Sequence, residues 1–169
     1  MVRIAEAERV VANIVRLVEG ARILSVPFEA TEQYPKGLGP TVPELAARIP
    51  ARSDKLTFSC SGVAGLSERF RAARAEKLLL AGVETHVCVL QTALDFLAQG
   101  FRVYVAADAV ASQRALDRDL AFRRLERSGA VLTTTEAALF EWTEVAGTPE
   151  FKGVSRLVTM PDREVLGRV

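Results

Sequence analysis

A cysteine at the start of a predicted helix is the residue of this chain best suited to chemistry. A short apolar run, Leu78–Ala81, predicts a buried parallel strand, and a sharp turn over 82–85 leads into a helix predicted over 86–99. Cys88 therefore lies in the first helical turn, at the carboxyl end of a strand. Open α/β sheets place their sites there, and a helix N-terminus stabilises a thiolate. The alternative is a buried structural cysteine.

Composition limits what such a site can be. The chain has 169 residues, 49% of them hydrophobic, and a net charge of +1. We expect a single domain over 1–169, with no nucleic-acid-binding surface and no membrane contact, because a basic patch and an apolar run of about 18 residues are both lacking. The N-terminus does not have the pattern of a signal peptide, and two cysteines do not make a disulfide framework, so a cytoplasmic location is predicted.

Metals and cofactors are not predicted either. His86 is the single histidine, which rules out a multi-histidine metal site, and the cysteines lack the C-x-x-C spacing of zinc ligands. No Gly-x-Gly-x-x-Gly follows a strand, so a dinucleotide site is not indicated.

The elements that must position Cys88 alternate between strand and helix. Apolar periodicity and turn residues predict strands over 28–31, 55–60, 78–81, 102–107 and 130–133, and helices over 4–25, 43–49, 66–74, 86–99, 117–127, 136–144 and 149–158. We expect Asp108 to end its strand and Asp117 or Asp119 to cap the helix that follows. This alternation predicts an α/β fold, a three-layer α/β/α sandwich with a mostly parallel, Rossmann-like sheet. The chain opens with a helix, and a long loop over 32–43 carries three prolines and two glycines.

The most specific stretch of the sequence is Ala81-Gly-Val-Glu-Thr-His-Val-Cys-Val89 with Gln91-Thr-Ala93. It resembles the nucleophile segment of the isochorismatase-like cysteine hydrolases, and the chain is similar in particular to the isochorismatase-domain subgroup of uncertain substrate. Further similar segments cover nearly the whole chain: Ala30–Pro35, Lys55 with Phe58-Ser59, Tyr104–Val110, Thr133–Phe140 and Phe151-Lys152.

The resemblance implies an Asp-Lys-Cys triad, in which Cys88 is the nucleophile and Lys55 the lysine. It also implies a cis peptide at Val83–Glu84 and an oxyanion hole built from the backbone around Glu84 and Cys88. Gln33, Tyr34, Phe58, Thr85 and His86 would then line the substrate pocket. Alternatively, Lys55 is a surface-loop lysine beside Asp54, and His86 is a packed, hydrogen-bonded side chain. Cys60 is expected in the core.

The sequence departs from the family at the triad Asp. In the family this residue ends a first strand ahead of the long helix, whereas Met1 here is already close to the predicted helix start. We expect that the N-terminal strand is missing between the strands at 28–31 and 78–81, and that the working protein has residues upstream. Alternatively, the chain rearranges or borrows a strand from another subunit. Asp54, Glu32, Glu84 and Asp108 are the possible substitute acids, and each is more simply a loop or capping carboxylate.

Two functions are consistent with these residues. The first is a hydrolase with a cysteine nucleophile that acts on a small-molecule amide, ester or related substrate. The second is a catalytically impaired family member that serves as an oligomeric or small-molecule-binding protein. No cofactor is expected from the residues, and the family resemblance implies a homo-oligomer, either a dimer or a tetramer.

Overall fold

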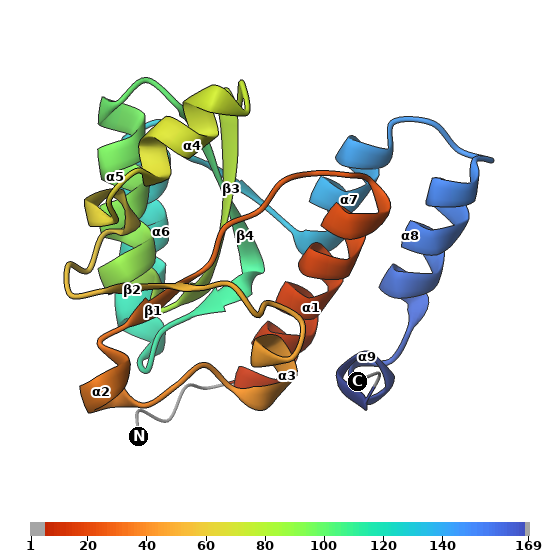
Figure 1. Ribbon diagram of the computed structural model, residues 1–169, viewed down its shortest axis with the longest axis horizontal. Helices are drawn as coiled ribbons and strands as arrows, with labels where there is room; N and C mark the ends of the chain where they lie inside the picture. Colours follow the sequence, from red (N-terminus) through yellow and green to blue (C-terminus); the bar gives the residue numbers. More distant parts are fainter. Residues whose placement is uncertain (1–5, 168–169) are drawn as a thin grey trace.

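Five parallel strands form the centre of the protein in the computed structural model, which describes residues 6–167. Three of them make one sheet in the order β3 (Lys77–Val83), β4 (Arg102–Ala111) and β5 (Val131–Thr133). The other two, β1 (Thr31–Gln33) and β2 (Ser53–Lys55), form a separate two-stranded sheet. Among the described residues, β1 pairs only with β2, and β3 pairs only with β4. In Figure 1, β3 and β4 run between two groups of helices, and β1 and β2 lie to the lower left.

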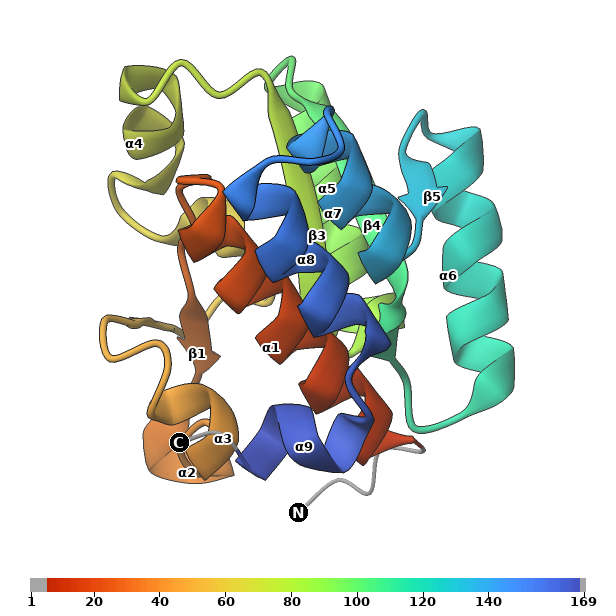
Figure 2. The ribbon, with the colours of Figure 1, turned by 90° about the vertical axis from the view of Figure 1, so that its right-hand side faces the viewer.

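Helices cover both faces of the three-stranded sheet, as in an α/β sandwich (Figure 1). On one face lie α5 (Leu90–Ala98) and α6 (Ala115–Arg127), with α4 (Leu66–Ala72) beside them. The other face is covered by α1 (Ala7–Ile23), α7 (Thr135–Thr143) and α8 (Pro149–Thr159), which Figure 2 shows in front of β3 and β4. Short helices α2 (Pro35–Leu38), α3 (Pro43–Ala46) and α9 (Asp162–Gly167) and a 3₁₀ turn at Cys60–Gly62 complete the chain.

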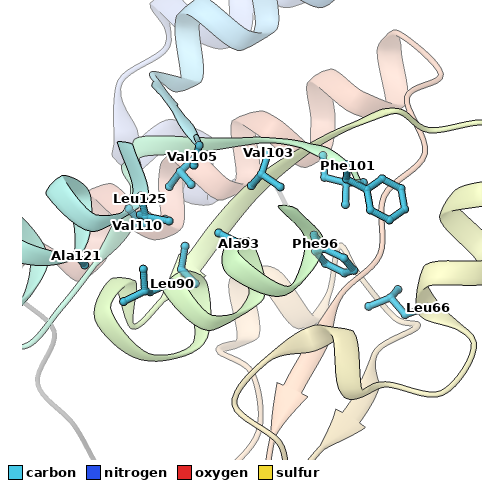
Figure 3. Packing of buried hydrophobic residues seen from close by; sticks show 13 residues of the cluster. Leu66, Leu90, Ala93, Phe96, Phe101, Val103, Val105, Val110, Ala121 and Leu125 are labelled. Atoms are coloured by element: carbon cyan, nitrogen blue, oxygen red, sulfur yellow. The ribbon is translucent and has the colours of Figure 1, made fainter. Parts of the chain in front are cut away.

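The larger hydrophobic core fills the space between the sheet and α5. Its centre is an aromatic cluster in which the Phe96 ring lies 5.8 Å from the Phe70 ring and 5.6 Å from the Phe101 ring, both edge-to-face. Figure 3 shows Phe96 beside Leu66, with the β4 residue Val103 above the helix. Burial of these side chains fixes α5 on the sheet, and with it the segment that carries Cys88.

A second core lies on the opposite face, under α1, α7 and α8. Leu139 and Val154 are fully buried there against Ala106 and Ala109 of β4. Because β4 has buried side chains on both of its faces, it is the central strand of the layered structure.

The β4 strand contains a large bulge opposite the end of β3. Leu80 is paired with Val105 and Gly82 with Val110, so the single residue Ala81 faces the four residues 106–109. The prediction that the strand ends at Asp108 is therefore wrong, since the bulge absorbs the extra residues and pairing resumes up to Ala111.

Other predicted boundaries also differ from the structure. The first helix begins at Ala7 and ends at Ile23, because Ser25 adopts a left-handed φ of 56° and the Val26 N–H bonds the Ala21 carbonyl. Its predicted start at Ile4 lies outside the described residues. The strand predicted over 28–31 is shifted to 31–33, and pairing with β2 begins where the Ser53 N–H bonds the Ala30 carbonyl.

Two further predictions fail for local reasons. The strand predicted over 55–60 covers only Ser53–Lys55, because the chain then turns into the 3₁₀ helix at Cys60. The α6 helix begins at Ala115, so that Asp117 lies in its first turn and Asp119 further along, and neither caps the helix. No helix within residues 6–167 is long and apolar enough to span a membrane.

Candidate active site

Cys88 lies at the carboxyl end of β3, in a short π-helical segment (η2, Thr85–Val89) that continues into α5. The prediction of a helix over 86–99 is confirmed in position, although its first turn is π-helical rather than α-helical. Buried Val89 and Leu90, the next two residues, pack into the larger core, so the backbone at the cysteine is held in place. The Cys88 side chain itself is half-buried and free, as is that of Cys60.

The small sheet brings a lysine and a glutamine to this thiol. Gln33 and Lys55 are the last residues of β1 and β2 and are paired in register, so both side chains project at the carboxyl edge. The Lys55 ammonium nitrogen lies 3.7 Å from Cys88 Sγ, and the Gln33 amide oxygen lies 3.9 Å from the same sulfur. Three residues predicted for the site are thus brought together, two from the small sheet and one from the segment that follows β3.

The environment of Lys55 is unusual for a lysine, because the residue is only 7% exposed. Its ammonium donates to the Phe58 carbonyl at 2.7 Å, to the Thr57 carbonyl at 3.1 Å and to the Gln33 amide oxygen. Within residues 6–167, no carboxylate lies within ion-pair distance of it. A buried cation costs free energy unless an anion pairs with it. The half-buried thiol beside Lys55 would become that anion on losing its proton.

The turn between β3 and η2 is tied to the segment after β4. The peptide bond between Val83 and Glu84 is cis. The Glu84 carboxylate accepts a hydrogen bond from the Gln113 N–H at 2.7 Å, and His86 Nδ1 lies 2.9 Å from Ser112 Oγ. Both side chains therefore hold the cysteine segment against the loop that follows β4. This agrees with the alternative interpretations of His86 as a hydrogen-bonded side chain and of Glu84 as a loop carboxylate.

Thr85 is the most enclosed of the predicted pocket residues. Its side chain is fully buried, and its hydroxyl is the one buried side-chain polar atom without a hydrogen-bond partner among the described residues. The other predicted pocket residues lie nearer the surface: Tyr34 is 48% exposed and Phe58 is 52% exposed. Leu56, between Lys55 and Phe58, is 77% exposed and adds to an apolar rim.

None of the possible substitute acids has a contact with the thiol among the described residues. Asp54 is exposed on β2. The Glu32 carboxylate accepts from the Thr41 N–H at 2.8 Å and pairs with Arg52 at 3.0 Å, and these contacts, led by Thr41, lower the pKa of Glu32. The Asp108 carboxylate accepts from the backbone and hydroxyl of Thr135 at the start of α7. No cluster of three metal-binding side chains occurs in the described part of the chain.

Sequence reasoning missed the two carbonyls that hold the lysine. Thr57 and Phe58 contribute main-chain oxygens, which any residue type could supply, so no sequence signal could have identified them. Ser112 was also missed, although its position directly after a strand is a weak signal.

Comparison with known proteins identifies the family. Residues 2–137 match the isochorismatase domain model. The chain belongs to the isochorismatase family. Isochorismatase domain-containing protein 2 of Bos taurus is 43% identical over 162 residues, which are 94% of this chain and 78% of the relative. The family resemblance and the α/β sandwich predicted from the sequence are thus confirmed.

Two solved structures have the same fold as this chain. MAR1 ribonuclease from Caenorhabditis elegans superposes with a TM-score of 0.87 at 38% identity, covering 98% of this chain and 86% of its own. The YcaC gene product of Escherichia coli, described as an octameric hydrolase of unknown specificity, gives a TM-score of 0.80 at 27% identity, covering 92% and 78%.

Proposed function

We propose that this protein is an isochorismatase-like hydrolase in which Cys88 is the nucleophile and Lys55 stabilises its thiolate. The observation that carries the proposal is the 3.7 Å separation of Lys55 Nζ and Cys88 Sγ, at a buried ammonium with no carboxylate partner in the described residues. The fold supports the same conclusion, because YcaC, a structural neighbour, was described as a hydrolase.

The chemistry follows from the thiolate. A thiol with the usual pKa of about 8.5 is mostly protonated at neutral pH, and an adjacent ammonium favours the reactive anion. The sulfur attacks the carbonyl carbon of an amide or ester, and the carbon–nitrogen or carbon–oxygen bond breaks as a thioester forms. The proton released by the thiol ends on the departing amine or alcohol. Water then hydrolyses the thioester, which returns a proton to Cys88.

Backbone groups of the turn would stabilise the negative oxygen of the tetrahedral intermediate. Val83, Glu84 and Cys88 line the turn at the carboxyl end of β3, and preorganised N–H donors at such a position lower the barrier by a few kcal/mol. The substrate pocket in this proposal is lined by Gln33, Tyr34, Phe58, Thr85 and His86. The exposed apolar side chains of Tyr34 and Phe58 favour a small substrate with an apolar part.

A small molecule is proposed rather than RNA. The C. elegans neighbour is described as a ribonuclease, so RNA must be included in any substrate survey. The net charge of +1 does not provide the basic surface on which RNA affinity depends. We further propose a cytoplasmic homo-oligomer, which accords with the free cysteines and with the octameric assembly described for YcaC.

The test is acylation of the thiol by an activated ester. The protein is incubated with p-nitrophenyl acetate at pH 7, and acetyl groups on Cys88 and Cys60 are quantified by peptide mass spectrometry alongside release of p-nitrophenolate. We expect rapid acylation and repeated turnover at Cys88, both lost in Cys88→Ser and kept in Cys60→Ser. Acylation no faster than that of free cysteine would refute the hydrolase and leave a binding protein. Cleavage of a single-stranded RNA that requires Cys88 would refute the small-molecule substrate.

A further inference from the structure

The amide of Gln33 lies between the two reactive groups and is held in one orientation. Its nitrogen Nε2 donates to the Leu56 carbonyl at 2.9 Å, so its oxygen must face the other way. That oxygen accepts from the Lys55 ammonium and lies 3.9 Å from Cys88 Sγ. One neutral oxygen thus contacts both groups whose charges the proposed reaction depends on.

The ammonium of Lys55 has more acceptors than protons. It carries three N–H groups, and the oxygens of Gln33, Thr57 and Phe58 already account for three hydrogen bonds. Cys88 Sγ, at 3.7 Å, is the fourth acceptor around the same nitrogen. A thiolate at Cys88 must therefore take an N–H from one of the three oxygens. Thr57 and Phe58 offer backbone carbonyls, whereas the Gln33 oxygen belongs to a side chain, which can move.

Gln33 also interacts differently with the two protonation states of the cysteine. The thiol S–H can donate to the Gln33 oxygen, and that contact stabilises the neutral form. The thiolate has no proton to donate, and it then competes with the same oxygen for Lys55. Gln33 therefore favours the thiol in both ways.

We infer that Gln33 is a positioning residue that restrains the reactivity of Cys88, by holding Lys55 and accepting the thiol proton, rather than a residue that mainly contacts substrate. The inference rests on the proposed function, since it assigns a control on the same thiol. It predicts that the glutamine lowers the thiolate fraction of the resting site without abolishing it. The anion forms when substrate displaces the amide oxygen from Lys55, and the thiol proton passes through solvent to the departing amine or alcohol.

No other charged group described near the cysteine segment provides this control. Most of the charged groups on the elements packed against it either have other partners or are exposed. The partnered ones are Glu84 with Gln113, His86 with Ser112, Asp95 with Ser61, Asp108 with Thr135, Arg102 with Glu76 and Arg118 with Asp119. The exposed ones on β3 and α6 are Lys77, Arg123, Arg124, Glu126 and Arg127. Arg114 is exposed and Asp117 is half-exposed at the start of α6. Lys55 is the single charged group with a contact to the sulfur among the described residues.

Two substitutions of Gln33 should act in opposite directions. Gln33→Met keeps the length of the side chain but removes the oxygen, which frees one N–H of Lys55 for the thiolate. Gln33→Glu adds a negative charge about 4 Å from the sulfur, which disfavours a second anion and takes Lys55 as its ion-pair partner.

The experiment measures the alkylation of Cys88 by iodoacetamide between pH 5.5 and 9.5, resolved by peptide mass spectrometry. The thiolate displaces iodide, so the rate at low pH follows the thiolate fraction. At pH 6.5 we expect Gln33→Met to react about threefold to tenfold faster than wild type and Gln33→Glu to react about tenfold slower. Cys60 in the same samples serves as the internal reference.

The outcomes separate the inference from the function on which it rests. Unchanged alkylation profiles in both variants would overturn the role of Gln33. Rates that change in the same direction would also overturn it, because loss of a merely structural glutamine would disturb the site in the same way in both variants. Slow alkylation of wild-type Cys88, equal to that of Cys60, would instead overturn the proposed nucleophile. Urea unfolding of each variant shows that the comparison is made on folded protein, and Gln33→Asn, which keeps the amide, gives a second variant if either fails to fold.

Discussion

Substitution of Lys55 by methionine is the most direct perturbation of the proposed site. The change removes the ammonium and keeps a side chain of similar length. Two unit charges 3.7 Å apart attract each other by about 4 kcal/mol at an effective dielectric constant of 20, and by about 1 kcal/mol in water. Because Lys55 is buried and Cys88 is half-buried, the electrostatic stabilisation of the thiolate that Lys55→Met removes lies between these limits.

That loss converts into a measurable rate. A change of 1.4 kcal/mol is a factor of ten in the thiolate population, so the population at pH 7 falls by about 5-fold to 1000-fold. The less stabilised thiolate is intrinsically more nucleophilic, and on a logarithmic scale this higher reactivity offsets nearly half of the decrease in thiolate population. We therefore expect iodoacetamide to alkylate Cys88 about 3-fold to 40-fold more slowly in Lys55→Met than in wild type.

Matched controls make the result interpretable. Lys152→Met removes an exposed lysine from α8, on the far side of the sheet, and should leave the rate at Cys88 unchanged. Urea denaturation should place the stability of Lys55→Met within about 2 kcal/mol of wild type, since a buried charge and its carbonyl contacts are removed together. An alkylation rate in folded Lys55→Met within twofold of wild type would show that Lys55 does not stabilise the thiolate.

Three further predictions concern the fold and its acids. Phe96→Ala should lower the free energy of unfolding in urea by about 3–5 kcal/mol, because the ring is 1% exposed; a loss below about 1 kcal/mol would contradict its central position in the core. The hydrogen bond from Thr41 lowers the pKa of Glu32, so this carboxylate contributes stability above its unfolded pKa of about 4.3 that is lost as the pH falls through the folded value. Glu32→Gln should remove that part of the pH dependence between pH 6 and 3, measured by urea unfolding, and an unchanged slope would refute it. Asp108→Ala should cost about 1–3 kcal/mol of stability through loss of the bonds from Thr135, yet leave alkylation of Cys88 within twofold of wild type; a slower rate would place Asp108 in the site after all.

The cysteine segment was predictable because local patterns determine it. A short apolar run, a glycine turn and a helical repeat are each visible within 20 residues, and the structure places Cys88 where they indicate. The family was indicated by this stretch together with the other similar segments, and the match over residues 2–137 confirms it. The layered fold was indicated by the alternation of predicted strands and helices.

The lysine side of the site was less predictable from local patterns. The β1 and β2 strands are three residues each, so propensity over so short a window cannot fix their ends, and both predicted strands were displaced. That Gln33 pairs with Lys55 is a matter of register between segments 22 residues apart. The three hydrogen bonds of the ammonium depend on the path of the chain after Lys55, which the sequence pattern does not encode.

The division of the strands into two sheets has a consequence for the dynamics of the protein. Cys88 belongs to the large cooperative unit built on β4, whereas Lys55 and Gln33 stand on a two-stranded ribbon with three paired residues on each strand. Elements with so few pairings open by local unfolding at a small fraction of the global free energy. In native-state hydrogen exchange, the amides of Tyr34 and Ser53 should then exchange well before those of Val103 and Val105. Each opening separates the cation from the sulfur while the fold around Cys88 persists, so the opening equilibrium of the ribbon sets the fraction of molecules in which Lys55 contacts the thiol.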